Sequence, residues 1–205
     1  MTKPAWHPVI LLLCCLASPL ALAQGAEPYH IKADVLGETV ETWKQNHQDE
    51  KQDCIVNSAS DRFPDKSTPG LYGCLTLGSR QPMSYAEAKV GSRSVHFDDG
   101  RLYEVQYTLD SSWIAKDMYG MYYTILLAAL TDKFGKPTQL EDSDFANLTG
   151  GHVPNQVATW KNGVSTIRLT KMVGDLYTTM LTFSLDSLEQ DAISKTVAAR
   201  KPKDM

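Results

Sequence analysis

The sequence predicts an α+β domain built on an antiparallel sheet, with its helices packed on one face of that sheet. Two kinds of observation lead to this fold class. Asp99–Gly100 and Asn162–Gly163 each separate segments in which apolar and polar residues alternate, as the tight turns of β-hairpins do. Between these hairpins, residues 117–134 carry apolar side chains at helical spacing. The strand–helix–strand alternation of a parallel sheet is not found.

The first 23 residues have the order of a secretory signal peptide. Lys3 precedes the apolar stretch 9–17, and the small residues Ala21 and Ala23 stand before Gln24. The apolar stretch is shorter than the roughly 20 residues that a membrane-spanning helix needs. We therefore expect cleavage after Ala23, a mature chain without a transmembrane segment, and a periplasmic or secreted protein.

Cleavage would leave two of the four cysteines. Cys14 and Cys15 belong to the signal peptide and lack the preceding small residue that lipid attachment requires. Cys54 and Cys74 remain, and in an oxidising compartment they predict one structural disulfide. The closed loop of about 20 residues would stabilise the fold by roughly 3 kcal/mol. Neither a Cys-x-x-Cys spacing nor a flanking histidine indicates a redox or metal site.

The first half of the mature chain predicts one short helix followed by strands. Residues 24–35 show no clean period and form a lead-in segment. Leu36, Val40 and Trp43 are spaced by four and three residues, which predicts a helix over about 38–47. The other expected elements are strands at 54–56 and 71–77 around a surface loop at 61–70, a helical turn starting from the capping-box spacing of Ser84–Glu87, and hairpin strands at 95–97 and 103–109.

The second half predicts a long helix and a meander. The helix over 117–134 ends before Gly135 and Pro137, and the polar stretch 140–155 is expected to be a long loop. The remaining expected elements are strands at 157–160, 164–172 and 177–185, and then a C-terminal segment, 186–205, made of a helix capped by Asp186 or Ser187 and a charged tail. The α+β domain would span 36–185. Its halves, about 36–109 and 117–185, repeat a helix-then-strands pattern that is compatible with a divergent duplication.

Composition and motifs exclude several classes of function. A net charge of −4 and a pI of about 5.7 give no basic surface for nucleic acid. The sequence has no serine elbow, no zinc-hydrolase histidine pair and no phosphate-binding glycine loop. The acidic run of Glu141, Asp142 and Asp144 does not complete a calcium loop. We therefore predict no catalytic, cofactor-binding or metal-binding residue.

An aromatic cluster opens the long helix. Tyr119, Tyr122 and Tyr123 wrap more than one helix face, and Trp113 lies just upstream. One interpretation is core packing, with the tyrosine hydroxyls reaching water at the edges. The other is a partner-binding surface, because Tyr and Trp are enriched at interfaces.

Four short motifs carry a family resemblance. They are Leu36–Thr39 opening a helix, Phe97–Leu102 at a hairpin, Lys133–Pro137 closing a helix, and Trp160–Gly163 at the second hairpin. The chain resembles small exported bacterial α+β domains, namely the outer-membrane assembly lipoproteins of the BamE/SmpA type and the β-lactamase inhibitory proteins. The resemblance implies a non-enzymatic, protein-binding module of the cell envelope.

The sequence as a whole favours an exported, non-catalytic protein that binds another protein of the cell envelope or exterior. One alternative is an envelope hydrolase whose site is assembled from distant residues, with His96 or His152 and the acidic stretch as candidates. Another is a protein that captures a small ligand between its sheet and its long helix.

Overall fold

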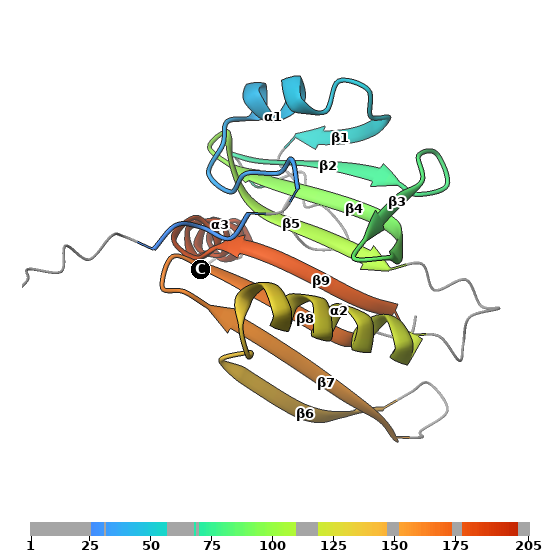
Figure 1. The fold of residues 1–205 in the computed structure, drawn as a ribbon. Helices are drawn as coiled ribbons and strands as arrows, with labels where there is room; N and C mark the ends of the chain where they lie inside the picture. Colours follow the sequence, from blue (N-terminus) through green and yellow to red (C-terminus); the bar gives the residue numbers. More distant parts are fainter. Residues whose placement is uncertain are drawn as a thin grey trace, which may run out of the picture.

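The computed structural model describes residues 26–30, 32–56, 68, 70–109, 119–146, 152–173 and 178–200. Within these residues one antiparallel sheet of nine strands forms the body of the protein (Figure 1). Its order is β1-β2-β4-β5-β9-β8-β7-β6, and β3 pairs with β4 beside this path. The helices are α1 (Val40–Asn46), α2 (Tyr119–Phe134) and α3 (Asp186–Arg200); the strands are β1 (Gln52–Val56), β2 (Leu71–Leu77), β3 (Met83–Tyr85), β4 (Ala88–Asp98), β5 (Arg101–Leu109), β6 (Gln139–Ala146), β7 (His152–Lys161), β8 (Ser165–Val173) and β9 (Thr178–Leu185).

Each half of the chain contributes one side of the sheet. In the first half α1 precedes β1–β5, and in the second half α2 precedes β6–β9. The last strand of each half, β5 and β9, pair with each other at the centre of the sheet. The α+β class and the antiparallel sheet are thus confirmed, while the duplication stays a hypothesis.

The helices lie on both faces of the sheet, not on one face as expected. Adjacent strand residues point to opposite faces, and Phe97 packs edge-to-face on Trp43 of α1 with ring centroids 5.5 Å apart. Its neighbour Asp98 instead forms an ion pair with Lys195 of α3. Figure 1 shows α2 in front of the sheet and α3 behind it. A second, smaller cluster of Leu71, Tyr103 and Ala192 provides the apolar contact for α3, which explains why a third helix can leave the main core.

The two hairpin turns form where the sequence places them. Asp99 and Gly100 both have positive φ, 44° and 77°, as a two-residue type I′ turn requires, and they join β4 to β5. Between β7 and β8, the Asn162 side-chain oxygen accepts hydrogen bonds from the backbone N–H groups of Val164 and Ser165. The strands that they connect pair in an antiparallel register.

The expectation of a helical turn at Ser84–Glu87 is wrong. These residues instead form the end of β3 and a tight turn into β4, with Tyr85 opposite Ala88. Ala86 and Glu87 adopt positive φ values of 44° and 68°. The turn lacks the Asn or Gly that usually marks this geometry, so the capping-box spacing suggested a helix instead.

The expectation of a long loop over residues 140–155 is also wrong. β6 occupies residues 139–146 and β7 begins at His152. β6 ends the sheet, and its residues 139–144 are all exposed. An edge strand with both faces in water needs no alternation of apolar and polar residues, so its sequence looks like that of a loop.

The lead-in segment and α1 attach to the β4–β5 hairpin. The Thr39 side chain caps α1 by accepting a hydrogen bond from the Thr42 backbone N–H. Backbone hydrogen bonds join Gly37 to Leu102 and Val40 to Gly100. This attachment holds residues 34–40 against the sheet and brings α1 over β4 and β5.

Cys54 and Cys74 form the expected disulfide. They lie directly opposite each other on β1 and β2 and are 20 residues apart in the sequence. The bridge ties the edge strand β1 to the rest of the sheet. Among the described residues no helix has the length and apolarity to span a membrane. The expected signal peptide, 1–23, and the tail at 201–205 lie outside the described residues.

Candidate functional site

The aromatic residues singled out in the sequence do not share one environment. Tyr123 is only 4% exposed and belongs to the main core; burial, with a smaller contribution from the charge of Asp142, raises its pKa to about 12. Tyr122 is half-buried and packs against the same core. Trp113 and the side chain of Tyr119 lie outside the described residues. Tyr123 therefore has the core role, and the partner surface that includes Trp113, Tyr119 and Tyr122 stays a hypothesis.

The described residues contain two polar groupings on the face that carries α1 and α2. The first, the Asp34 cluster, is centred on a carboxylate that is 1% exposed. The Trp43 indole N–H donates to Asp34 Oδ1 over 2.8 Å, and the Tyr107 hydroxyl donates to Oδ2 over 3.1 Å. The remaining members of the cluster are His47, Glu50 and Arg93.

Basic side chains lie beside Asp34. His47 Nε2 lies 3.3 Å from Oδ1, and Arg93 Nη1 lies 3.6 Å from Oδ2. Arg93 also pairs with Glu50, and its guanidinium lies 5.8 Å from the centre of the Trp43 ring. Burial, together with the Asp34 charge, raises the pKa of Tyr107, which keeps this hydroxyl protonated. Apart from the half-buried Glu50, the Asp34 cluster is buried, and it joins the lead-in, α1 and β4–β5, so its geometry is that of a structural tie.

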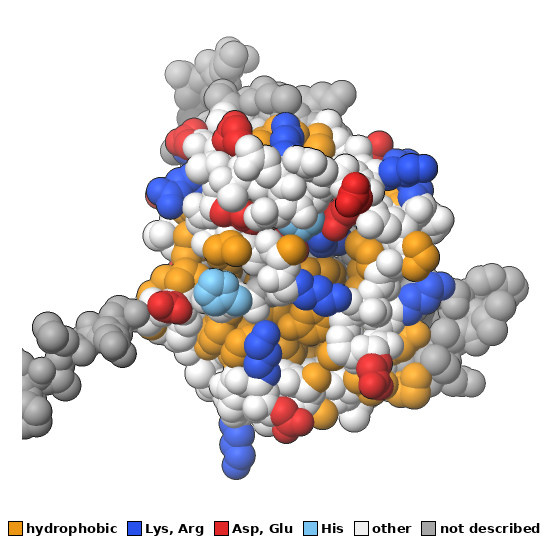
Figure 2. Space-filling view, turned by 45° about the horizontal axis from the view of Figure 1, so that its top comes forward, with side chains coloured by type: hydrophobic (Ala, Val, Ile, Leu, Met, Phe, Trp, Pro, Cys, Tyr) orange, Lys and Arg blue, Asp and Glu red, His pale blue; other side chains and the backbone are white. Residues whose placement is uncertain are grey.

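The second grouping surrounds a cavity of about 200 Å³ between α2 and the β3–β4 turn. We call it the lysine pocket; it is lined by Lys32, Tyr85, Ala86, Ala129, Leu130 and Lys133. Three separate parts of the chain supply these residues: the lead-in, the β3–β4 hairpin and the last two turns of α2. In Figure 2 this side of the molecule shows hydrophobic side chains at the base of a hollow with Lys or Arg side chains reaching over it.

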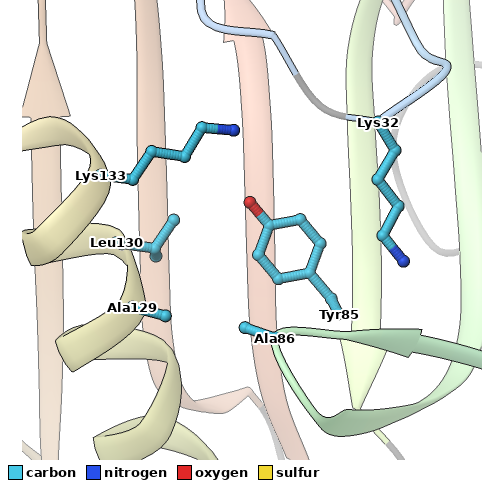
Figure 3. A pocket seen from close by; sticks show the side chains of 6 residues that line it. All are labelled: Lys32, Tyr85, Ala86, Ala129, Leu130 and Lys133. Carbon is cyan, nitrogen blue, oxygen red and sulfur yellow. The ribbon is translucent and has the colours of Figure 1, made fainter.

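The polar groups of the lysine pocket retain free hydrogen-bonding capacity. In Figure 3 the Tyr85 hydroxyl points toward α2, and it forms no hydrogen bond with the described residues. Burial raises the pKa of Tyr85 to about 12, so at neutral pH the hydroxyl is a donor. The Lys32 ammonium donates a hydrogen bond to the Ser84 carbonyl oxygen, and Lys133 Nζ lies 3.4 Å from the His30 carbonyl oxygen. An ammonium has three N–H donors, so each lysine keeps donors for a ligand.

The backbone around the lysine pocket is strained. Lys32 has a φ of 51°, and Ala86 and Glu87 on the β3–β4 turn have φ values of 44° and 68°. For residues other than glycine this region is unfavourable by roughly 1–2 kcal/mol each. Such strain accumulates where surrounding structure holds a functional geometry in place. Three of the four described non-glycine residues with positive φ lie at this rim.

Of the two histidines named for a hydrolase, His96 lies far from the acidic residues, whereas His152 lies on β7, which pairs with the acidic strand β6. His96 lies on β4, and four strands separate β4 from the acidic β6, which carries Glu141, Asp142 and Asp144. His96 is 6% exposed, and its ring nitrogens have no hydrogen-bond partner among the described residues. Burial lowers its pKa to about 4, so it is neutral at pH 7. The His152 side chain lies outside the described residues.

Metal-binding geometry is equally absent from the part of the chain that the structure describes, where no three His, Cys, Asp or Glu side chains gather into a suitable group. Comparison with protein-family models, with curated proteins and with solved structures finds no match for this chain. Its function must therefore be argued from the chemistry of its own side chains.

Sequence reasoning missed the residues of the lysine pocket as a set. Lys32 lies in a segment without a period, Tyr85 lies where a helical turn is expected, and Lys133 belongs to the motif Lys133–Pro137 that closes the long helix. The residues are brought together only by the fold, and no local spacing connects them. The sole signal was the general expectation of a small-ligand site between the sheet and the long helix.

Proposed function

We propose that this protein is an exported, non-catalytic module that binds another protein of the cell envelope or exterior. The lysine pocket is the observation that carries the proposal. It offers a phenol donor and two ammonium groups around an apolar floor. These groups attract and orient a ligand, whereas a phenol whose pKa is raised to about 12 is a poor base at neutral pH.

The size of the pocket favours a protein segment over a whole small molecule. Pockets for drug-sized ligands usually measure about 300–1,000 Å³, compared with about 200 Å³ here. An apolar cavity of about 150 Å³ holds one benzene molecule. The lysine pocket therefore has room for one large side chain of a partner. Small-ligand binding is the second candidate, since the cavity lies between α2 and the sheet, where such a ligand was expected.

Export is supported by two features. The residue order of 1–23 is that of a signal peptide, and the Cys54–Cys74 disulfide is compatible with an oxidising compartment. Purification of the native protein should yield Gln24 as the first residue and no free thiol. An intact Met1 together with two free thiols at Cys54 and Cys74 would contradict export.

Partner capture tests the binding function. We would compare the mature wild-type protein, the variant Lys32→Glu/Lys133→Glu, and the charge-matched control Lys136→Glu/Lys161→Glu as bait for envelope and exterior proteins. Lys136 and Lys161 are exposed and do not line the pocket. A partner retained by wild type and control, and lost by the pocket variant, would support the proposal. Retention of the same proteins by all three baits would contradict it.

A further inference from the structure

We infer that the lysine pocket recognises a carboxylate that stands next to one large apolar group, as at the C-terminus of a protein that ends in an aliphatic residue. This inference rests on the proposed binding function and names the chemistry of the partner. It combines the charge, the volume and the hydrogen-bonding capacity of the pocket.

Charge is the first argument. Two lysines and no acid are found among the described residues that line the cavity, although the whole chain carries a net charge of −4. Lys32 and Lys133 come from different elements and approach opposite sides of the Tyr85 ring region (Figure 3). Both lysines are exposed, and two positive charges at one cavity attract a negatively charged group.

The helix end beside the pocket favours a singly charged anion. Lys133 lies in the last turn of α2, which ends at Phe134. The C-terminus of a helix carries a partial negative charge, so it opposes a doubly charged phosphate more than a carboxylate. The lining set also contains no arginine, the residue best suited to bidentate phosphate binding. A carboxylate therefore fits this position better than a phosphate.

The apolar floor decides what stands next to the carboxylate. Ala86, Ala129 and Leu130 line the cavity together with the face of the Tyr85 ring. The small alanine side chains leave the space of about 200 Å³ open. One branched aliphatic group fills such a space and removes its apolar surface from water, which favours binding.

These two requirements identify a chain terminus. The carboxylates of Asp and Glu side chains stand on unbranched methylene arms, whereas the α-carboxylate of a last residue is bonded to the Cα atom that also carries that residue's side chain. A terminal leucine thus presents a carboxylate and a branched aliphatic group together. Capture of C-terminal carboxylates is a known mode of peptide recognition. A free branched-chain acid has the same chemistry, so the experiment must separate the two sources.

The Tyr85 hydroxyl adds an uncharged hydrogen-bond donor to the pocket. Its hydroxyl has no hydrogen-bond partner among the described residues and points toward α2, where Lys133 lies (Figure 3). A protonated phenol can donate one hydrogen bond to a carboxylate oxygen, with the ammonium groups as the charged donors. The Tyr85 hydroxyl and Lys133 thereby offer donors to a carboxylate on the α2 side of the ring, and Lys32 adds positive charge on the opposite side (Figure 3).

Calorimetry with synthetic six-residue peptides tests the inference on the mature, disulfide-bonded protein. The probes are a peptide ending in leucine with a free carboxylate, its C-terminal amide, the same peptide ending in glycine, and 4-methylpentanoate. We expect the free-acid leucine peptide to bind, and both amidation and the change to glycine to weaken binding at least tenfold. No binding of any probe, or equal binding of acid and amide, would overturn the inference.

Variants locate the binding in the pocket. Lys32→Met/Lys133→Met keeps most of each side-chain stem and should weaken binding of the leucine peptide at least tenfold. Tyr85→Phe should weaken it about threefold or more, and the control Lys136→Met/Lys161→Met should leave it unchanged. Unfolding curves show whether each variant is folded. Unchanged affinity in the folded lysine variant would overturn the assignment of the site.

The outcomes separate this inference from the proposed function. Binding of 4-methylpentanoate as tightly as the peptide would support the carboxylate site and contradict a protein partner. A captured partner that depends on Lys32 and Lys133, but still binds after removal of its own last residue, would contradict the C-terminal mode and leave the protein-binding function standing.

Discussion

The Asp34 cluster and the lysine pocket lie side by side on one face of the sheet and differ in what their polar groups contact. The rings of Tyr107 and Tyr85 lie 5.5 Å apart, one in each grouping. The Tyr107 hydroxyl donates to Asp34, whereas the Tyr85 hydroxyl has no partner among the described residues. Polar groups that are paired and closed to water stabilise a fold, and polar groups left open in a cavity are available to a ligand.

Backbone geometry follows the same division. Lys32, Ala86 and Glu87 have positive φ at the rim of the lysine pocket. No described residue of the Asp34 cluster has a positive φ. A tie that supports stability thus lies beside a site with a strained rim and an unpaired phenol donor, although Arg93 Nε and His47 Nε2 of the tie also have no hydrogen-bond partner among the described residues. Four predictions test this division, in decreasing order of effect.

The largest effect is expected at Asp34. Asp34→Ala would remove one of the two carboxylates that pair with the buried Arg93, leaving Glu50, and would remove an acceptor from Trp43 and Tyr107. We expect a loss of about 3–5 kcal/mol in the free energy of unfolding, measured in urea. In contrast, Lys32→Met/Lys133→Met should change stability by less than about 0.5 kcal/mol. Equal losses in the two variants would remove the distinction between tie and site.

His96 is a buried polar residue that belongs neither to the Asp34 cluster nor to the lysine pocket. Burial lowers its pKa to about 4 from the usual value of 6.5, so between these two pH values the unfolded chain binds more protons than the folded chain. Stability contributed by neutral His96 is complete above pH 6.5 and decreases as the pH falls toward 4, by roughly 3 kcal/mol in total. Urea unfolding from pH 7 to pH 4 should show a steeper loss for wild type than for His96→Leu. An equal loss of stability in wild type and His96→Leu over this pH range would contradict the assigned role of His96.

The two tyrosines provide a matched pair. Tyr107→Phe removes a hydrogen bond to the buried Asp34 carboxylate and should reduce stability by about 1.5–3 kcal/mol. Tyr85→Phe removes no hydrogen bond to the described residues and should change stability by less than about 0.5 kcal/mol. Urea unfolding of both variants is the measurement. A larger loss for Tyr85→Phe would reverse the assignment of the two groupings.

The smallest effect concerns strain at the pocket rim. Glu87→Gly relieves a φ of 68° and adds the entropy of a glycine to the unfolded chain, so we expect a net stabilisation of about 0.5 kcal/mol. Glu41→Gly, in the first turn of α1, should instead destabilise by about 1 kcal/mol. The melting temperatures of the two variants, measured by calorimetry, test this difference. Peptide affinity should not change in Glu87→Gly, because Glu87 does not line the cavity.

Local sequence patterns predicted the elements whose turns and ends carry the residues usual for them. The hairpins at Asp99–Gly100 and Asn162–Gly163 were found because their turn residues are the usual ones, and α2 because Gly135 and Pro137 mark its end. β3 was missed because Ala86 and Glu87 occupy a turn that usually takes Asn and Gly. β6 was missed because an exposed edge strand has no periodic pattern.

The two polar groupings could not be predicted at all from local patterns. Asp34 meets Arg93, 59 residues further along the chain (93 − 34), and Tyr107, 73 residues further along. Lys32 and Lys133 come to line one pocket only through the packing of α2 on the sheet. Local spacing carries no information about such contacts. The prediction of helices on one face failed for a related reason, since Leu71 and Tyr103, the partners of α3, are interleaved with residues of the main core.

The acidic edge strand β6 has a consequence for how copies of this protein behave in a concentrated solution. An edge strand offers backbone groups to which another strand can add. Glu141, Asp142 and Asp144 are exposed on both sides of this strand, so a second copy brought alongside would place like charges together. Electrostatic repulsion thereby guards this end of the sheet against growth into fibrils.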